Sequence, residues 1–389
     1  SSSKIFMFAG EPSGDQLGAD LCHALKKQNS LLEISGVAGP QMRTAGVQPV
    51  LEMEDFAVMG FSDVLLALPR LFFKRNAIVK WILHNRPDTV VLIDYIEFNL
   101  HLAKTLRSKG YKGKIVQYVS PTVWAWRAGR ADTLAMHYDL LLTTYPFEAK
   151  YYSHTSLPLR YVGNPTKERI NSLVYRSNWK EELNLVDTDP LVALFPGSRK
   201  GEIDLNLPKQ LAVAEQLVRQ HPNLRFALSY ANERLLDKIM KHVRESTLNL
   251  GQDLFLIPGE YSQELMQASV AALAKSGTVT LELALHDCPT VVMYELSWIN
   301  RFIAKYLIRL NMSHYCIVNI LATRTLFPEF YERNLCVNDI ANALEAFISD
   351  QKARQQCIAG CHAIAQLLGN HNAAANAAQA ILERGLQCK

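Results

Sequence analysis

The sequence predicts an α/β protein made of two doubly wound parallel-sheet domains. Its 389 residues exceed what one ordinary hydrophobic core organises. Short apolar runs alternate with helical stretches along most of the chain, which is typical of parallel sheets covered by helices on both faces. Small and polar residues follow directly after several of these runs, where open parallel sheets bind their ligands.

Two series of apolar runs predict the strands. A polar helical stretch at 166–184 and a turn at 187–190 separate the series, so we expect domains at 1–168 and 169–389. From residue 338 the pattern is helical and rich in alanine, which predicts a helical tail. The expected strands are 4–9, 34–38, 89–94, 114–118 and 140–144 in the first domain, and 191–195, 225–229, 254–257, 270–274 and 290–293 in the second.

The overall composition excludes several classes of protein. A hydrophobic fraction of 49% with 20% charged residues is typical of a soluble globular protein, and the net charge of +4 gives no argument for a nucleic-acid partner. The seven cysteines are scattered without a Cys-x-x-Cys pair, which indicates reduced thiols. No uncharged apolar run approaches the ~20 residues of a membrane span. The opening Ser-Ser-Ser-Lys leads directly into a strand, so we expect no signal peptide.

Polar residues follow three expected strands of the first domain. The segment 10–15 lacks the Gly-x-Gly-x-x-Gly spacing, so it is either a plain turn or a substrate loop before a helix at 16–27. Asp94 ends an apolar strand, where an unpaired carboxylate is costly, so it is a candidate base, although a helix cap is the alternative. Trp124 and Trp126 share one side of an extended loop and form either a core wall or a ligand wall. The candidate substrate-loop residues are Glu11, Ser13, Gly14, Asp15, Asn99, Ser120, Trp124 and Arg127.

The turn after strand 191–195 is a candidate anion site. Gly197 and Ser198 leave the backbone open to close approach by an anion beside Arg199. A surface ion pair is the alternative role for Arg199. The pattern Asp187-x-Asp189 resembles a metal-binding motif of sugar-transfer enzymes, but Pro190 follows it and indicates a turn, so we predict no metal.

The stretch 272–285 combines a strand, a tight turn and a helix start. Ser276, Gly277 and Thr278 would aim backbone N–H groups and the positive end of a helix dipole at a phosphate or diphosphate. Glu282 lies four residues after Thr278 and faces the same way, so its carboxylate could accept hydrogen bonds from a ribose diol. An ordinary connection with Glu282 in solvent is the alternative.

The segment 59–83 mixes large apolar side chains with a cluster of cationic ones, and it has no acid after Asp63. Such a helix could lie in the interface of an anionic membrane, or it could pack on the sheet with its charges in water. The candidate membrane-contact residues are Leu65, Leu68, Leu71, Phe72, Phe73 and Trp81.

Several short motifs occur in a characteristic order along nearly the whole chain. They are 10–15 (Gly-Glu-Pro-Ser-Gly-Asp), 37–40 (Val-Ala-Gly-Pro), 53–60 (Met-Glu-Asp-Phe-Ala-Val-Met-Gly), Ile93-Asp94, Phe98-Asn99, 118–127 (Tyr-Val-Ser-Pro-Thr-Val-Trp-Ala-Trp-Arg), 196–199 (Pro-Gly-Ser-Arg), Ser276-Gly277-Thr278 with Glu282, and 319–322 (Asn-Ile-Leu-Ala). With these motifs the chain resembles the lipid-A-disaccharide synthase family of bacterial inverting glycosyltransferases. Two departures from the family pattern are visible: Ile96-Glu97 stands where Pro-Asp is usual, and Gly163-Asn164-Pro165 where Gly-His-Pro is usual.

The resemblance implies a fold and a reaction. The fold would be two facing Rossmann-like domains of the GT-B type, with the acceptor on the first domain and the UDP-sugar on the second. UDP-2,3-diacylglucosamine would donate its sugar to 2,3-diacylglucosamine 1-phosphate, giving a β-1,6-linked disaccharide and UDP in lipid A biosynthesis. The enzyme would work in the cytoplasm, peripherally on the inner face of the inner membrane, without metal or other cofactor.

The resemblance also implies residue roles. Asp94 would be the base, with Glu97 as the competing carboxylate, and Arg199 would assist the departing diphosphate. Ser276, Gly277 and Thr278 would hold the same diphosphate, Glu282 the ribose, and Asn319 the nucleotide side. The sequence leaves open whether two copies form a homodimer and what Asn164 does in place of histidine.

Overall fold

The computed structural model of the chain describes residues 3–56, 61–120, 129–185, 190–295, 314–331 and 335–385, with the side chains of 61–72 and 384–385 also left undescribed. The chain forms two compact units. Unit 1 comprises Ser1–Glu168 and Asn370–Lys389, and unit 2 comprises Arg169–Gly369.

Unit 1 contains a seven-stranded parallel sheet with the strand order β3-β2-β1-β4-β5-β6-β7. The order reverses direction between β1 and β4, which makes the carboxyl ends of these two strands the switch point of the winding. The elements are β1 Lys4–Phe8, α1 Pro12–Gln28, β2 Glu33–Ala38, α2 Pro40–Ala45, β3 Gln48–Glu52, α3 Phe61–Asn85, β4 Thr89–Ile93, α4 Ile96–Ser108, β5 Lys114–Tyr118, α5 Arg130–His137, β6 Leu140–Thr143, β7 Leu159–Tyr161 and α16 Ala373–Gly385.

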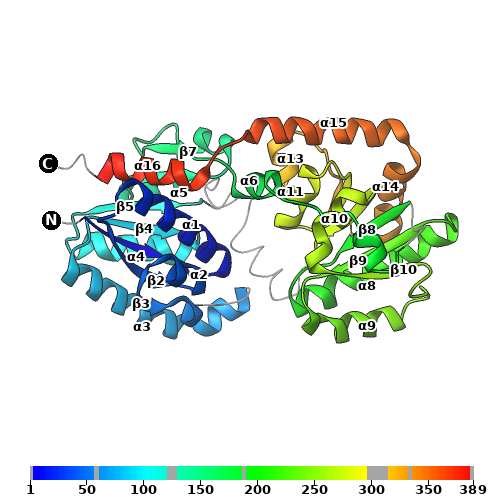
Figure 1. Cartoon of the computed structure of the whole chain (residues 1–389), viewed down its shortest axis with the longest axis horizontal. Helices are drawn as coiled ribbons and strands as arrows, with labels where there is room; N and C mark the ends of the chain where they lie inside the picture. Colours follow the sequence, from blue (N-terminus) through cyan, green and yellow to red (C-terminus); the bar gives the residue numbers. More distant parts are fainter. Residues whose placement is uncertain are drawn as a thin grey trace. The chain divides into compact units, whose positions relative to one another are not determined.

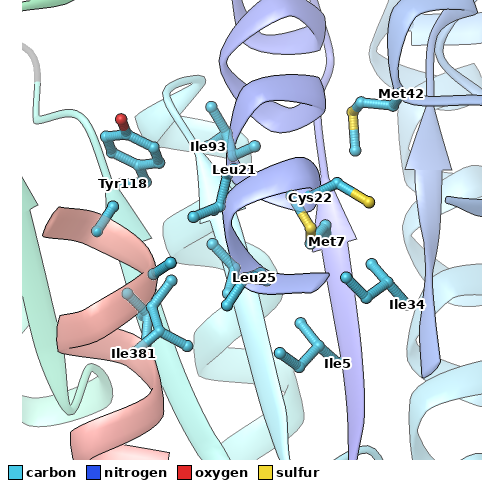
Figure 2. Packing of buried hydrophobic residues seen from close by; sticks show 14 of the residues in the cluster. Ile5, Met7, Leu21, Cys22, Leu25, Ile34, Met42, Ile93, Tyr118 and Ile381 are labelled. Carbon is cyan, nitrogen blue, oxygen red and sulfur yellow. The ribbon is translucent and has the colours of Figure 1, made fainter. Parts of the chain in front are cut away.

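Successive residues of β1 point to opposite faces of this sheet and into two separate cores. Ile5 and Met7 pack with residues of α1 and α16, as Figure 2 shows for Leu25 and Ile381. Phe6 and Phe8 pack on the other face, against residues of α3, α4 and α5. Every residue of β4 is buried, as expected for a central parallel strand covered by helices on both sides.

The C-terminal helix belongs to the first unit, although the expected second domain ran to residue 389. Helix α16 lies beside α1 in the same layer (Figure 1). Ala377 and Ile381 are buried in the unit 1 core, and Asn376 Nδ2 donates a 2.8 Å hydrogen bond to the carbonyl oxygen of Val162. The alanine-rich face of the tail therefore completes the core of its own first unit.

Unit 2 contains a six-stranded parallel sheet with the order β10-β9-β8-β11-β12-β13. Its winding reverses between β8 and β11. Short helix α6 (Pro165–Asn171) runs across the boundary between the units. The remaining elements are α7 Trp179–Glu182, β8 Leu191–Phe195, α8 Lys200–Gln220, β9 Arg225–Tyr230, α9 Leu236–Arg244, β10 Leu254–Pro258, α10 Ser262–Ala268, β11 Ala271–Lys275, α11 Thr278–Leu285, β12 Thr290–Met293, α13 Ile317–Ala322, β13 Glu329–Phe330, α14 Val337–Ser349 and α15 Gln351–Leu368.

The expected fold class, with two parallel α/β domains and a helical tail, is confirmed. All ten predicted strands are present, whereas the edge strands β3, β7 and β13 were not predicted. None of their residues is buried, so they lack the continuous apolar run by which central strands are predicted. A second difference concerns α1, which begins at Pro12 rather than at residue 16, because proline suits the first helical position.

Candidate active site

Unit 2 contains a cavity of about 480 Å³ at the carboxyl ends of β8 and β11. These strands flank the switch point of the sheet, so the cavity occupies the usual ligand position of an open parallel sheet. The cavity brings together the two predicted anion-binding turns and Glu282. Predicted residues that line it are Gly197, Ser198, Arg199, Ser276, Gly277, Thr278 and Glu282.

The turn after β8 places a helix N-terminus at this cavity. Gly197 has a φ of +118°, and a Cβ there would come within 2.8 Å of the Glu202 Cβ, so glycine is required. Arg199 is the N-cap residue of α8, and its side chain makes no cap hydrogen bond. The first N–H groups of α8 and an exposed guanidinium are therefore available to an anion.

The turn after β11 repeats this arrangement. Gly277 is the N-cap of α11, again without a side-chain cap, and Ser276 and Thr278 flank it in the cavity wall. Thr280 is buried, and its hydroxyl donates a 2.7 Å hydrogen bond to the Gly277 carbonyl, which holds the turn. Two uncapped helix N-termini thus point positive dipole ends toward one cavity, an arrangement that favours a diphosphate.

Lys275, which was not among the predicted site residues, also lines the cavity. Lys275 ends β11, forms an ion pair with Glu202, and places its Nζ 4.9 Å from the centre of the Tyr294 ring. Both partners lie elsewhere in the sequence, so only the fold reveals the contact. Because Glu202 neutralises Lys275, Arg199 supplies the cavity's exposed cationic group among the described lining residues.

Glu282 lines the cavity and is held from behind. Its Oε1 accepts a 2.5 Å hydrogen bond from Arg169 Nη2 and a 3.1 Å hydrogen bond from Gln263 Nε2. The carboxylate side chain is 17% exposed. Both contacts are to Oε1, so Oε2 can take a ligand hydroxyl.

Asn319 differs from its expected role on the nucleotide side. It is fully buried and does not line the cavity. Its Oδ1 accepts hydrogen bonds of 2.8 Å from the N–H groups of Leu326 and Phe327, and its Nδ2 donates to the Phe327 carbonyl at 2.7 Å and to Glu329 at 2.5 Å. Both N–H groups and both acceptor positions of its amide are thus used within unit 2, so Asn319 supports the fold.

In unit 1, Asp94 follows β4 at the switch point of the sheet. Asp94 has a φ of +49° and Tyr95 one of +45°, so two successive residues other than glycine adopt the left-handed conformation. Such backbone is retained only where the surroundings enforce it, and it clusters at functional sites. Asp94 does not cap α4 with its side chain; Tyr95 is the N-cap residue and has no side-chain cap bond.

The surroundings of Asp94 suit a base that works near neutral pH. The pKa of Asp94 is raised to about 6, mainly by burial and also by the negative charge of Glu11, while a hydrogen bond from the Tyr95 backbone opposes both effects. The fold has therefore brought together two of the predicted residues, Asp94 and Glu11. By contrast, Glu97 is exposed and lies 3.7 Å from Arg130 in an ion pair.

Two other predicted residues support the backbone near Asp94. Asn99 is buried, and its Nδ2 donates to the carbonyl oxygens of Ile93, at 3.3 Å, and of Asp94. Ser120 is also buried, with its hydroxyl 3.0 Å from that of Tyr152. Both side chains are buried and bonded within the protein, whereas the substrate-loop role expected for them requires an accessible side chain.

In the segment 10–15, Glu11 is the N-cap residue of α1 and Pro12–Asp15 form the first turn of that helix. Asp15 is 3% exposed and accepts hydrogen bonds from the N–H groups of Gln41, at 2.9 Å, and Met42, at 3.0 Å. Asp15 therefore caps α2 instead of facing a substrate. Gly14 is buried, whereas Glu11 and Ser13 keep solvent exposure.

Five further residues singled out in the sequence remain to be placed: four lie in undescribed segments, and Asn164 lies at the start of α6. Trp124, Arg127, Asp187 and Asp189 lie outside the described residues. Asn164 caps α6, because its Oδ1 accepts a 3.0 Å hydrogen bond from Lys167 N and its Nδ2 donates one of 3.0 Å to the Thr144 carbonyl. The neutral amide of Asn164 thus caps the helix at the position where the family usually has histidine.

Helix α3 covers one face of the unit 1 sheet with its C-terminal half. Trp81 packs against Phe6, with 5.4 Å between ring centres, so it contributes to the core and differs from its expected place in a membrane-contact face. Phe73 is 77% exposed. The side chains of Leu65, Leu68, Leu71 and Phe72 lie outside the description. No helix within the described ranges is long and apolar enough to cross a membrane.

Solved structures show the same fold at low sequence identity. An E. coli structure described as trehalose-6-phosphate bound with UDP-2-fluoro glucose matches with a TM-score of 0.60 and 12% identity, over 99% of each chain. The UDP-GlcNAc 2-epimerase of Neisseria meningitidis bound to UDP-GlcNAc matches with a TM-score of 0.54 and 10% identity, over 99% of this chain and 100% of that one. These likenesses confirm the expected GT-B type of fold.

Sequence comparison gives the family. Lipid-A-disaccharide synthase of Chlamydia muridarum is 38% identical over 359 residues, which are 91% of this chain and 58% of the relative. The chain thus spans little more than half the length of its chlamydial relatives. Lipid-A-disaccharide synthase of Azotobacter vinelandii is 35% identical over 98% of this chain and 97% of that relative. The family model for lipid-A-disaccharide synthetase matches residues 5–383, and the chain belongs to that family.

Proposed function

We propose that this protein transfers a diacylglucosamine unit from UDP-2,3-diacylglucosamine to 2,3-diacylglucosamine 1-phosphate. The products would be the β-1,6-linked disaccharide 1-phosphate and UDP. Family membership over residues 5–383 supports the reaction class. The single observation that carries the proposal is Asp94, a partly buried carboxyl group with a pKa of about 6 at the switch point of the unit 1 sheet.

The donor would bind in the unit 2 cavity. Its diphosphate would accept hydrogen bonds from the N–H groups at the starts of α8 and α11 and from the Arg199 guanidinium. The ribose diol would donate to Glu282 Oε2. This assignment supplies positive charge to the leaving UDP from helix dipoles and one arginine, which stabilises the charge that develops as the bond breaks.

The acceptor would be activated from unit 1. The oxygen of its primary hydroxyl attacks the anomeric carbon of the donor sugar, the bond from that carbon to the diphosphate oxygen breaks, and the hydroxyl proton passes to the Asp94 carboxylate. A single displacement inverts an α linkage to a β linkage. A base with a pKa of about 6 is largely ionised at neutral pH and still accepts a proton in the transition state.

Acylated substrates reside in a lipid layer, so we also propose that the protein contacts an anionic membrane surface through α3. Phe73 is exposed on this helix. The neighbouring Lys74 is mostly covered and pairs with Asp55, so the exposed aromatic side chain is the described feature of α3 that supports the contact. The corresponding location is the cytoplasmic face of the inner membrane.

The test is to incubate the protein with both substrates in the presence of a chelator and to analyse the products by mass spectrometry. We expect a disaccharide monophosphate and UDP, formed only when both substrates are present. Consumption of the UDP-sugar without acceptor would indicate a different UDP-sugar reaction, such as epimerisation. An intact donor that nevertheless binds would contradict the transferase proposal.

A further inference from the structure

We propose that Gln117 is a positioning residue that fixes the backbone of Asp94 and of Val119 in their active conformations. The proposal rests on the proposed function, because it concerns the residue assigned as the base. It assigns a role to a buried amide that the sequence did not reveal.

Gln117 is a fully buried polar residue in β5, between Val116 and Tyr118, which are also buried. Its Nε2 donates a 2.9 Å hydrogen bond to the carbonyl oxygen of Asp94 and a 3.0 Å hydrogen bond to that of Val119. One amide group therefore bridges the residues that leave two adjacent strands, β4 and β5. Both N–H groups of the amide are used by this bridge.

Both bridged residues have strained backbone. Asp94 has a φ of +49°, and Val119 has one of +71°, which is rare for a β-branched side chain. Left-handed backbone at residues other than glycine is costly and persists where surrounding contacts enforce it. The hydrogen bonds from Gln117 act on the carbonyl groups of these two residues, so the amide favours the strained form of both turns.

Tyr138 fixes the orientation of this amide. Its hydroxyl donates a 2.9 Å hydrogen bond to Gln117 Oε1, and both side chains are buried. With Oε1 accepting from Tyr138, the NH₂ end must face the two carbonyl groups. A buried chain of hydrogen bonds thus runs from Tyr138 through Gln117 to Asp94.

A second buried amide acts on the same residue. Asn99 Nδ2 also donates to the Asp94 carbonyl, while Asn99 Oδ1 has no hydrogen-bond partner among the described residues. Among the described residues, the side chain of Asn99 donates hydrogen bonds on the β4 side, to Ile93 and Asp94. Gln117 alone of the two joins this turn to the Val119–Ser120 turn, so its removal should disturb both strand ends.

The first test replaces Gln117 with methionine, which keeps the length of the side chain and removes its donors. We expect kcat of Gln117→Met to fall on the order of 100-fold, the scale of an ångström-sized misplacement of a catalytic group. The Kd for UDP should not change, because the UDP cavity lies in unit 2. A purely structural role would leave the kcat of the folded fraction unchanged.

The second test is a matched pair of tyrosine variants in unit 1. Tyr138→Phe removes the hydroxyl that orients Gln117, and Tyr111→Phe removes an equally buried hydroxyl that donates 2.7 Å to the Pro87 carbonyl. Both should lose similar stability. Only Tyr138→Phe should lower kcat. We expect a loss of about 10-fold, smaller than for Gln117→Met, because the Gln117 amide is still present and can still donate to the Asp94 and Val119 carbonyls although its orientation is no longer fixed. Equal kcat for both variants would overturn the proposal.

A titration separates this proposal from the assignment of the base. The ¹³C signal of the Asp94 carboxyl, identified by its loss in Asp94→Asn, should titrate near pH 6 in the wild type. In Gln117→Met we expect the midpoint to move toward that of an exposed aspartate as the turn relaxes and hydrates, while Glu11, Tyr95 and Tyr145, the titratable groups around Asp94, remain.

The outcomes are distinguishable. An unmoved midpoint and full kcat in Gln117→Met would overturn the positioning role while leaving Asp94 as the base. Full activity in Asp94→Asn, with a midpoint that still moves in Gln117→Met, would overturn the assignment of the base and leave the positioning role intact.

Discussion

Arg169 Nη2 lies 2.5 Å from Oε1 of Glu282, and this contact joins helix α6 to the wall of the unit 2 cavity. Gln263 holds the same oxygen at 3.1 Å. The carboxylate proposed to bind the ribose is therefore fixed in orientation before any ligand arrives, which lowers the cost of ordering it on binding.

This relationship predicts the order of two effects on UDP binding. Glu282→Gln should weaken UDP by about 10-fold, because the ribose loses a charged acceptor. Arg169→Met should weaken it by only about threefold, since an ion pair of this exposure contributes little by itself. The loss of UDP affinity in the double variant should be smaller than the product of the two single losses, because the residues are in contact. Isothermal titration calorimetry measures all three, and a larger loss in Arg169→Met than in Glu282→Gln would contradict the ribose assignment.

The raised pKa of Asp94 predicts a pH-dependent stability difference. Between the unfolded pKa of about 3.9 and the folded value of about 6, the folded state binds more protons, so stability falls as pH rises through this window. Asp94→Asn carries no such charge and should be more stable than the wild type at pH 8, by up to about 3 kcal/mol. The advantage should vanish near pH 3.5. Urea unfolding at both pH values measures it, and equal stability at pH 8 would argue against a desolvated carboxylate.

Asp15 should behave as a cap and not as a substrate ligand. Asp15→Ala removes the acceptor for two N–H groups of α2 and should cost about 1–2 kcal/mol of unfolding free energy. The KM for the acceptor should not change. Ser13→Ala, two residues away and exposed, is the matched control and should not alter stability. A raised KM with normal stability in Asp15→Ala would restore the substrate role.

Membrane contact through α3 predicts a position-specific loss of vesicle binding. Phe73→Ser should lower partitioning onto phosphatidylglycerol-containing vesicles by about 10-fold, the contribution of one inserted phenyl ring. Leu31→Ser is the control, because Leu31 is 74% exposed, almost as much as Phe73 at 77%, but lies outside α3. Equal binding by both variants in a sedimentation assay would contradict an α3 contact.

The sequence predicts the parts of this molecule whose signals are local. Central strands such as β4 and β8 are continuous apolar runs, and the residues that follow them, Asp94 and Arg199, were found because position after a strand is visible in the chain. Both candidate anion-binding turns of unit 2 were predicted for the same reason, and the structure places them in one cavity.

What the sequence does not predict depends on contacts between distant segments. Asp15 carries no local mark of its partners Gln41 and Met42, and nothing in an alanine-rich tail indicates that α16 joins unit 1. Gln117 had a weak signal, a glutamine between apolar residues of an expected strand, but its partner Tyr138 lies 21 residues away, so the role proposed for it rests on the fold.

The most direct test of the account is the turnover of Asp94→Asn at saturating concentrations of both lipid substrates, with the Kd for UDP measured on the same preparation. We predict a loss of kcat on the order of 1000-fold, at the scale of a missing general base, with UDP affinity and folding intact. Turnover within a few-fold of the wild type would contradict the account, because the step from acceptor hydroxyl to base would then need another residue.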